Sequence, residues 1–407
     1  MTTTREAQSS TNGPVLHVAF EVGQSEWKLA LTIGLGQEPR LKTVAARDRE
    51  AVLREIAKSK KRFGLAEDAP VVSCYEAGRD GFWLHRWLVS VGVVNRVVDS
   101  SSIEVNRKQR RAKTDRLDAS SLVRLLVRYQ LGEKKSFGVV RVPSDAEEAE
   151  RHLHRELLAL KDERTRLINQ LKGHLCGQGL VLGAVNKKFE EWLRQAWRWD
   201  GSTVPAELQE RLRRIFERWQ LVHRQILTLE AEQRRRIRCD ETPQVKLVRE
   251  LLMLKGIGRC GAWMLVKELF GWRRGFNRKQ LGALVGLVPT PFNSGKSCRE
   301  QGISKAGNKQ LRRLLVELAW CWVRHQPGSA LTLWFQQRFG QGKRLRRIGI
   351  VGLARKLLIA VWRYLERGEL PAGAVVVDWQ AKLNCCQRQP RTGPSEAAES
   401  LAEAAVT

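Results

Sequence analysis

Four acidic residues in the first third of the chain stand where a carboxylate has few structural roles. Glu21 lies in or at the end of the apolar run VLHVAFEV, and Glu76 directly follows the run VVSCY. Asp115 and Asp118, in KTDRLDA, are three residues apart, so on a helix they share one face. Burying a lone carboxylate is costly unless a cation compensates its charge. Together the four carboxylates predict a site for one or two Mg²⁺ or Mn²⁺ ions.

Two of these residues also have a structural interpretation that needs no metal. Asp115 would cap a helix that begins near Arg116, and Glu21 would neutralise a buried arginine. A metal site is therefore predicted by the four carboxylates together and not by any one of them. Four such carboxylates within one small domain are unexpected in a strongly basic chain, and a bound metal ion would account for them.

The densest basic run of the chain surrounds the two aspartates. Cations beside metal-binding carboxylates suit a phosphodiester substrate, because they hold its backbone while a metal stabilises charge on the reacting phosphate. A solvated helix face is the alternative interpretation of such a run. The residues of this run that we expect to bind nucleic acid are Arg107, Arg110, Arg111 and Lys113.

A second candidate site lies in the stretch PFNSGKSCREQGISK. Ser294 sits in an Asn-Ser-Gly-Lys turn, where the adjoining glycine lets a phosphorus atom approach the hydroxyl without steric hindrance. Ser297 lies in the same stretch, so the residues alone leave two candidate serines, and a loop serine often has no chemical role. The nearby cations that would hold a phosphate are Lys296, Arg299 and Lys305.

A Gly-x-Gly turn in LLMLKGIGRCGA (251–262) is a weaker candidate for phosphate binding. Backbone N–H groups of the turn and of the following helix would face the phosphate. Close packing of the two flanking helices explains the same glycines equally well.

The elements that must position these residues begin with a mixed α/β pattern. Apolar and alternating runs predict strands, and two amphipathic stretches between them predict helices. We expect strands at about 15–22, 27–33, 41–45, 71–75 and 93–98, and helices at about 48–62 and 80–90.

The middle of the chain predicts two long helices joined by residues 177–205, which hold several glycines and a Trp-rich short helix. The second long helix carries a heptad seam, which indicates either a dimerising coiled-coil arm or an intramolecular helical hairpin. The seam residues alternate in spacing between four and three, and they are Leu208, Leu212, Ile215, Trp219, Val222, Ile226 and Leu229.

The rest of the chain predicts a compact helical domain, with helices at about 308–324 and 344–366. The expected organisation is a disordered N-terminus (1–13), a mixed-sheet domain (14–143), a coiled-coil or helical arm (144–243), the compact helical domain (244–375) and a disordered tail (376–407).

Composition limits the class of protein. The 407 residues include 72 Lys and Arg against 43 Asp and Glu, a formal net charge of +29. Such a surplus favours a polyanionic partner, most simply nucleic acid. No apolar run is long enough to span a membrane, and the N-terminus lacks the apolar core of a signal peptide. The eight cysteines form no CxxC pair, which fits the reducing cytoplasm.

The ordered motifs resemble those of the IS one-ten family of DEDD-type, bridge-RNA-guided insertion-sequence transposases. The resemblance covers residues 15 to 367. The motifs that carry it are VAFEV, YEAGRDGFWLHRWL, RRAKTDRLDA, HLHRELLALKDERTRLINQLKG and GIG…GLVP…SG…ISKAGNKQLRR.

The resemblance implies a RuvC-like (RNase H-type) domain, a coiled-coil insertion and a C-terminal transposase domain with a nucleophilic serine. Glu76, Asp115 and Asp118 match three of four acidic ligands, Glu21 stands where the family more commonly has aspartate, and Ser294 matches the serine before glycine. The implied partners are DNA, a structured guide RNA and further copies of the chain in a dimer or tetramer. The implied setting is the bacterial cytoplasm, at the nucleoid.

The function expected on these grounds is a transposase that cuts and rejoins DNA through a serine nucleophile and a magnesium-binding carboxylate site. Two alternatives remain open at this point. One is a Mg²⁺-dependent RuvC-like nuclease or resolvase in which Ser294 is structural. The other is a non-catalytic nucleic-acid scaffold whose acidic residues are caps and ion pairs.

Overall fold

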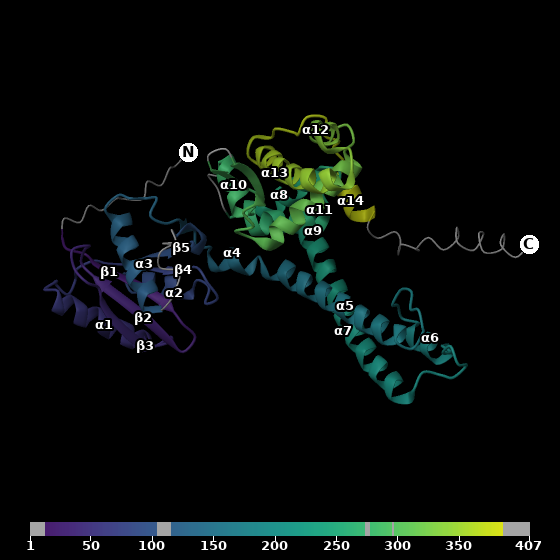
Figure 1. Ribbon diagram of the computed structural model, residues 1–407, viewed down its shortest axis with the longest axis horizontal. Coiled ribbons are helices and arrows are strands. Elements are labelled where there is room, and N and C mark those ends of the chain that lie inside the picture. The colour runs from purple at the N-terminus through teal and green to yellow at the C-terminus, as the bar shows by residue number, and fades with distance from the viewer. Residues whose placement is uncertain (1–12, 104–114, 273–276, 295–296, 386–407) are drawn as a thin grey trace, which may run out of the picture. The chain divides into compact units, whose positions relative to one another are not determined.

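The computed structural model describes the backbone of residues 13–103, 115–272, 277–294 and 297–385. Side chains at 101, 115–117, 292–294, 297–301 and 384–385 are also outside the description. The chain divides into two compact units, Met1–Val142 and Pro143–Thr407 (Figure 1).

The first unit is built on a six-stranded mixed sheet with the order β3-β2-β1-β4-β5-β6. The β1–β4 and β4–β5 pairs are parallel, and the other neighbours are antiparallel. This arrangement is compatible with an RNase H-like fold, as predicted. The strands are β1 (Leu16–Val22), β2 (Glu26–Thr32), β3 (Arg40–Ala45), β4 (Val71–Glu76), β5 (Val94–Val98) and β6 (Val139–Val140).

Helices cover both faces of this sheet. Large side chains such as Phe20 and Trp27 pack on one face against α1 (Arg49–Arg62) and α2 (Trp83–Ser90). The other face presents the small residues Ala19, Ala30 and Cys74, over which α3 (Asp115–Gln130) packs with Ala119 and Leu122. Small side chains let a helix approach a sheet closely, so this face holds α3 near the ends of β1 and β4. The strands and helices expected between 15 and 98 are confirmed.

The second unit begins with a helical arm. Helices α5 (His152–Cys176) and α7 (Ala206–Cys239) lie side by side (Figure 1). Their apolar side chains form one core together with those of α6 (Phe189–Gln195). The seam residues Leu212, Ile215, Trp219, Val222 and Ile226 are buried by this packing within a single chain. The arm consists of α4 (Asp145–Ala149), α5 (His152–Cys176), α6 (Phe189–Gln195) and α7 (Ala206–Cys239).

For this stripe the structure supports the alternative of an intramolecular hairpin, and dimerisation through the arm stays a prediction. A heptad pattern records which face of a helix is apolar, and α5 supplies the same apolar surface that a second chain would.

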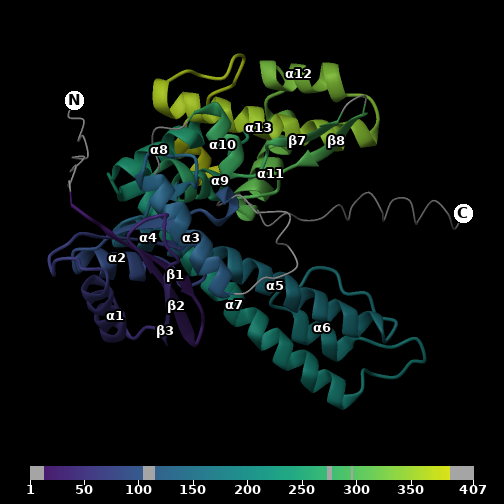
Figure 2. The same ribbon diagram turned by 60° about the vertical axis from the view of Figure 1, so that its left-hand side comes forward.

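The body of the second unit is a helical domain (Figure 2). Its large apolar core is built around Trp263 and Trp322. The helices predicted at 308–324 and 344–366 are confirmed as α11 (Lys309–His325) and α13 (Lys343–Arg367). Its elements are α8 (Pro243–Met253), α9 (Arg259–Leu265), a π-helical turn η3 (Val266–Phe270), α10 (Arg278–Leu284), β7 (Pro289–Ser294), β8 (Ser297–Ile303), α11 (Lys309–His325), α12 (Ala330–Phe339), α13 (Lys343–Arg367) and α14 (Trp379–Cys385).

Two expectations for this region need correction. The domain predicted to be helical contains the β7–β8 hairpin. The tail predicted from residue 376 is ordered as far as Cys385: Val376 pairs with Leu254, and Leu383 of α14 is buried in the core. The Pro, Gly and Glu content that marks a solvated tail begins only beyond α14. None of the described helices is both long and apolar enough to cross a bilayer.

A buried ionic cluster joins the arm to the body. The carboxylate of Glu268, in η3, is 2.8 Å from Nε2 of His154 and accepts hydrogen bonds from Arg155 at 2.7 and 3.0 Å. Only 2% of the Glu268 side chain is exposed. Next to it in η3, buried Lys267 pairs with Glu150. Burial alone would raise the pKa of Glu268, but the hydrogen bonds from His154 and Arg155 outweigh it and lower the pKa to about 2.

We expect Glu268→Gln to lower the free energy of unfolding by about 1–3 kcal/mol near neutral pH, because it removes the charge that the half-exposed Arg155 pairs with and disturbs the hydrogen bond to the buried His154 ring. Since the pKa is lowered from 4.5 to about 2, the stabilisation is full above pH 4.5. It declines as the pH falls towards 2. Thermal unfolding between those pH values measures both effects. The control Glu317→Gln removes an exposed partner of Arg313 and should cost at most about 1 kcal/mol. Equal losses in the two variants would contradict this account.

Candidate active site

The parallel pairing of β1 and β4 brings Glu21 and Glu76 together. The register runs from Leu16 opposite Val71 to Phe20 opposite Tyr75, and the two glutamates are the next residue on each strand. Side chains alternate between the faces of a strand. Two residues earlier, Ala19 and Cys74 lie under α3. Glu21 and Glu76 therefore leave the sheet on the α3 side as neighbours.

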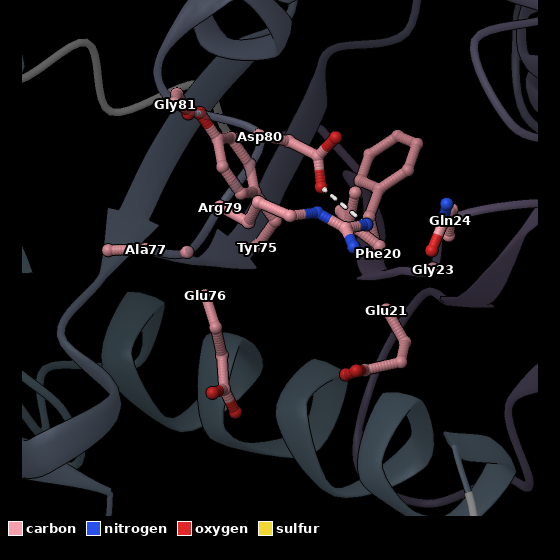
Figure 3. Close-up of a pocket in the computed structure, with 12 residues that line it drawn as sticks. Phe20, Glu21, Gly23, Gln24, Tyr75, Glu76, Ala77, Arg79, Asp80 and Gly81 are labelled. Atoms are coloured by element: carbon pink, nitrogen blue, oxygen red, sulfur yellow. Dashed lines mark hydrogen bonds and ion pairs between the residues drawn. The ribbon is translucent and has the colours of Figure 1, made fainter. Parts of the chain in front are cut away.

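A pocket of about 430 Å³ opens at these strand ends, and Figure 3 shows both glutamates pointing away from the same side of the sheet. Its other wall is the loop 77–81, which lies within the motif YEAGRDGFWLHRWL but was given no role in the site by the sequence. Asp80 in that loop forms ion pairs with Arg47 at 3.6 Å and Arg79 at 3.7 Å. The Tyr75 hydroxyl donates a hydrogen bond to the carbonyl of Gly81 at 3.1 Å. The GRDG sequence directly after a buried strand was the available signal for this loop.

Glu76 is a half-buried carboxylate that makes no hydrogen bond or ion pair within the part of the chain that the structure describes. Its charge reaches Cys74, whose pKa is raised first by burial and then by the Glu76 carboxylate. On the opposite face, burial raises the pKa of Tyr75 to about 12. In a chain of net charge +29, a carboxylate without a cationic partner at a strand end is an unusual feature. It suits a bound cation.

The two aspartates begin the helix that covers this face. Asp118 is half-buried, precedes the buried Ala119, and makes no hydrogen bond or ion pair within the described residues. The backbone of α3 starts at Asp115, whose side chain lies outside the description. Among the described side chains, no three His, Cys, Asp or Glu groups come together as a metal-ligand set. The four-carboxylate metal site therefore stays a prediction. The donor set itself suits Mg²⁺, which prefers carboxylate oxygens.

The basic residues expected around the aspartates lie outside the described part of the chain. These are Arg107, Arg110, Arg111 and Lys113. Further along α3, Arg124 pairs with Glu38 at 3.0 Å and Arg128 with Glu133 at 2.6 Å, both on the surface. These two arginines are thus neutralised locally.

The structure places Ser294 at the tip of a two-stranded hairpin. It is the last residue of β7 and pairs with Ser297, the first residue of β8. Gly295 and Lys296, between them, lie outside the description, as do the side chains of Ser294, Ser297 and Arg299.

The base of the hairpin is held by close backbone contacts. The Lys305 N–H donates to the carbonyl of Gly286, and the Asn308 N–H donates to that of Leu284. Lys305 has a positive φ of 56°, rare for a residue other than glycine. Its side chain is exposed, as a phosphate contact requires. Gly286 has a φ of 68°, and a Cβ there would lie 2.0 Å from the carbonyl oxygen of Ala306.

We expect Gly286→Ala to lower the free energy of unfolding by about 1–3 kcal/mol and to displace the hairpin, because neither φ nor space suits a side chain. The midpoint of thermal unfolding measures the first effect. Gly183→Ala is the control, since that glycine has open space and no positive φ. A thermal midpoint equal to that of the control would contradict this expectation, because the backbone around Ala306 would then move aside without loss of stability.

In the Gly-x-Gly turn, Gly256 follows the alternative interpretation, that of helix packing, as does Gly261 further on, whereas a Cβ on Gly258 would meet no neighbour within 4 Å. A Cβ on Gly256 would lie 3.3 Å from the carbonyl oxygen of Cys321, and one on Gly261 would lie 3.1 Å from Leu318. Both partners belong to α11. These glycines therefore let α8 and α9 approach α11.

Comparison with known proteins identifies the family. The model of the transposase IS116/IS110/IS902 family matches residues 248–333, which run from α8 into α12 and include Ser294. A protein of Sinorhizobium fredii named as a transposase, y4rJ, is 38% identical over 379 residues, covering 89% of this chain and 94% of that protein. The chain belongs to the IS116/IS110/IS902 transposase family. It is a DNA transposase, as its motifs predicted.

More distant relatives of the transposase carry the same kind of name. The transposase for insertion sequence element IS1328 of Yersinia enterocolitica is 27% identical, over 63% of this chain and 72% of its own length. A probable family 20 transposase of Pseudomonas aeruginosa is also 27% identical, over 58% of this chain and 69% of its own. The family model covers the serine hairpin of the transposase and not the carboxylate domain.

Proposed function

We propose that the transposase cuts and rejoins DNA strands with Ser294 as nucleophile and with a divalent-metal site formed by Glu21, Glu76, Asp115 and Asp118. The observation that carries the proposal is the pair of neighbouring strand-end glutamates, one without a cationic partner in the described chain. Family membership supports the same reaction class.

The proposed serine step is a transfer of a phosphoryl group from DNA to the serine and back. The Ser294 oxygen attacks the phosphorus of a DNA phosphodiester and gives its proton to a base, for which a carboxylate is suited. One oxygen–phosphorus bond forms, the bond to the leaving deoxyribose oxygen breaks, and that oxygen takes up a proton. The phosphoryl group stays on the serine. Attack by another strand's hydroxyl reverses these changes and rejoins the DNA.

The carboxylates are suited to hold one or two Mg²⁺ or Mn²⁺ ions. When bound, such ions would supply charge stabilisation at the reacting phosphate. Glu21 and Glu76 would contribute from the sheet, and the aspartates from the first turn of α3. Ser294 and the carboxylates belong to different units. Catalysis therefore requires Ser294 and the carboxylates to come together on the DNA. The two groups would belong either to one chain or to different copies in a dimer or tetramer.

A structured guide RNA is the remaining part of the proposal. The support for it is the family resemblance together with a net charge of +29, which favours nucleic-acid backbones in general. Base pairing with such an RNA would select the DNA target, while the protein holds the backbones. We expect a discrete RNA to co-purify with the protein expressed alongside its flanking DNA.

The test is incubation of the transposase with labelled target DNA, the co-purified RNA and Mg²⁺, followed by denaturing electrophoresis. We expect a labelled band at the mass of the protein, which marks a covalent adduct, and joined DNA products. Cleavage without an adduct would favour the Mg²⁺-dependent nuclease. Binding with neither product would favour the scaffold.

A further inference from the structure

The start of α13 extends beyond the core of the second unit. Every residue from Lys343 to Ile348 is exposed, although all are helical. Burial begins at Gly349, on which the Phe339 ring of α12 lies so closely that a Cβ would be 2.3 Å from it. The first turns of α13 are therefore an uncovered helical end, held in place by the packing that starts at Gly349.

On the exposed end of α13, cations occupy the helix face that is apolar and buried further along the helix. Ile350, Leu353 and Leu357 pack into the core. Residues three and four positions earlier on a helix share a face. Arg346 and Arg347 therefore stand where the apolar stripe would continue. Lys343 lies a further turn back along it.

No acid within the described chain neutralises these cations. Lys343, Arg344, Arg346 and Arg347 make no ion pair there, and the first turn of α13 holds no acidic residue. The Arg346 guanidinium lies 5.9 Å from the ring centre of Trp320, a contact that leaves its charge in place. Positive charge at a helix N-terminus opposes the helix dipole and weakens the helix. Here the N-cap, Gly342, also supplies no side-chain cap.

We propose that this cationic helix end, defined as Lys343–Ile348, binds the phosphate backbone of double-stranded DNA. Four uncompensated cations at a helix N-terminus are an arrangement that costs stability in the free protein and is complementary to a polyanion. The inference takes DNA as the substrate from the proposed function. It does not depend on Ser294 or on the carboxylates.

Duplex DNA is favoured over RNA by shape. The major groove of B-form DNA is about 12 Å wide and admits an α-helix. The corresponding groove of an RNA helix is too deep and narrow for side chains to enter. An α-helical end that is exposed all round fits the major groove of B-form DNA. Arginines there can also reach the phosphates on either side.

The test compares two double variants of full-length protein by fluorescence anisotropy with a labelled DNA duplex over a range of salt concentrations. Arg346→Gln with Arg347→Gln removes two of the cations. Arg211→Gln with Arg214→Gln removes two exposed cations of the arm helix α7, so the two double variants have the same net charge. Both pairs replace arginine by a good helix former. The first pair should also keep or slightly raise the thermal midpoint, because it relieves the conflict with the helix dipole.

We expect the α13 variant to bind DNA about tenfold more weakly, with a salt slope reduced by roughly 0.9 for each phosphate that the protein no longer neutralises. The α7 control should change affinity much less. Equal losses of affinity in both variants would overturn the proposal, since the charge would then act diffusely. An unchanged affinity would also overturn it. A loss confined to binding of structured RNA, measured in a parallel titration, would assign the surface to RNA instead. Adduct formation tests the proposed function separately.

Discussion

Replacing Glu76 by Gln is expected to reduce DNA cleavage by the transposase by roughly a thousandfold or more, because a divalent metal contributes several kcal/mol to such a reaction. The change keeps the side chain's size and removes its charge. It should leave the fold intact, since Glu76 makes no hydrogen bond or ion pair in the described chain. The measurement is the rate of strand cleavage at saturating Mg²⁺. Binding of the same DNA should change little.

The matched control is Glu38→Gln in the same unit. Glu38 is exposed and pairs with Arg124 on the surface, so we expect near-normal cleavage. A second measurement separates metal binding from catalysis: Mn²⁺ should raise the thermal midpoint of the wild type by mass action and raise that of Glu76→Gln much less. Wild-type cleavage in Glu76→Gln would remove this residue from the site. An equal metal-induced shift in both proteins would remove it from the metal ligands.

The first unit could be predicted closely from its sequence because local pattern and tertiary role agree there. The run at 15–22 is apolar on both faces, and β1 is central and buried on both faces. The position of Glu76 directly after a strand was enough to place it at a sheet edge. The sequence grouped Glu21 with Glu76 in one predicted metal site, but the exact alignment of the two residues is given by the parallel register, which depends on contacts distant in sequence.

In the second unit, the pattern of apolar residues along the sequence predicts the helices but not what packs against them. The heptad seam of α7 predicts an apolar face correctly, but it cannot say whether α5 or another chain covers that face. The β7–β8 hairpin was missed for a different reason. Its sequence PTPFNSGKSCREQGI is rich in proline, glycine and polar residues, which predict turns. The hairpin depends on contacts at its base, where Gly286 and Gly307 accept close neighbours. Such contacts leave no periodic signal.

Replacing Ser294 by Ala is expected to abolish the covalent protein–DNA adduct and all strand exchange, because the attacking oxygen is lost. DNA binding should remain nearly intact, since affinity in a chain of net charge +29 comes from many phosphate contacts. The measurement is denaturing electrophoresis after incubation with labelled DNA and Mg²⁺, beside anisotropy for binding.

Ser297→Ala is the matched control that the hairpin provides. The two serines face each other across the last backbone pair before the tip, so each variant removes one hydroxyl from the same local structure. The two serines differ in their C-terminal neighbours. Ser294 precedes Gly295, which has no side chain to obstruct a phosphate, whereas Ser297 precedes Cys298. We therefore expect Ser297→Ala to keep the adduct. An adduct that persists in Ser294→Ala, or that disappears only in Ser297→Ala, would refute the assignment of Ser294. Metal-dependent cleavage without any adduct in the wild type would instead identify the carboxylate domain as the whole catalyst.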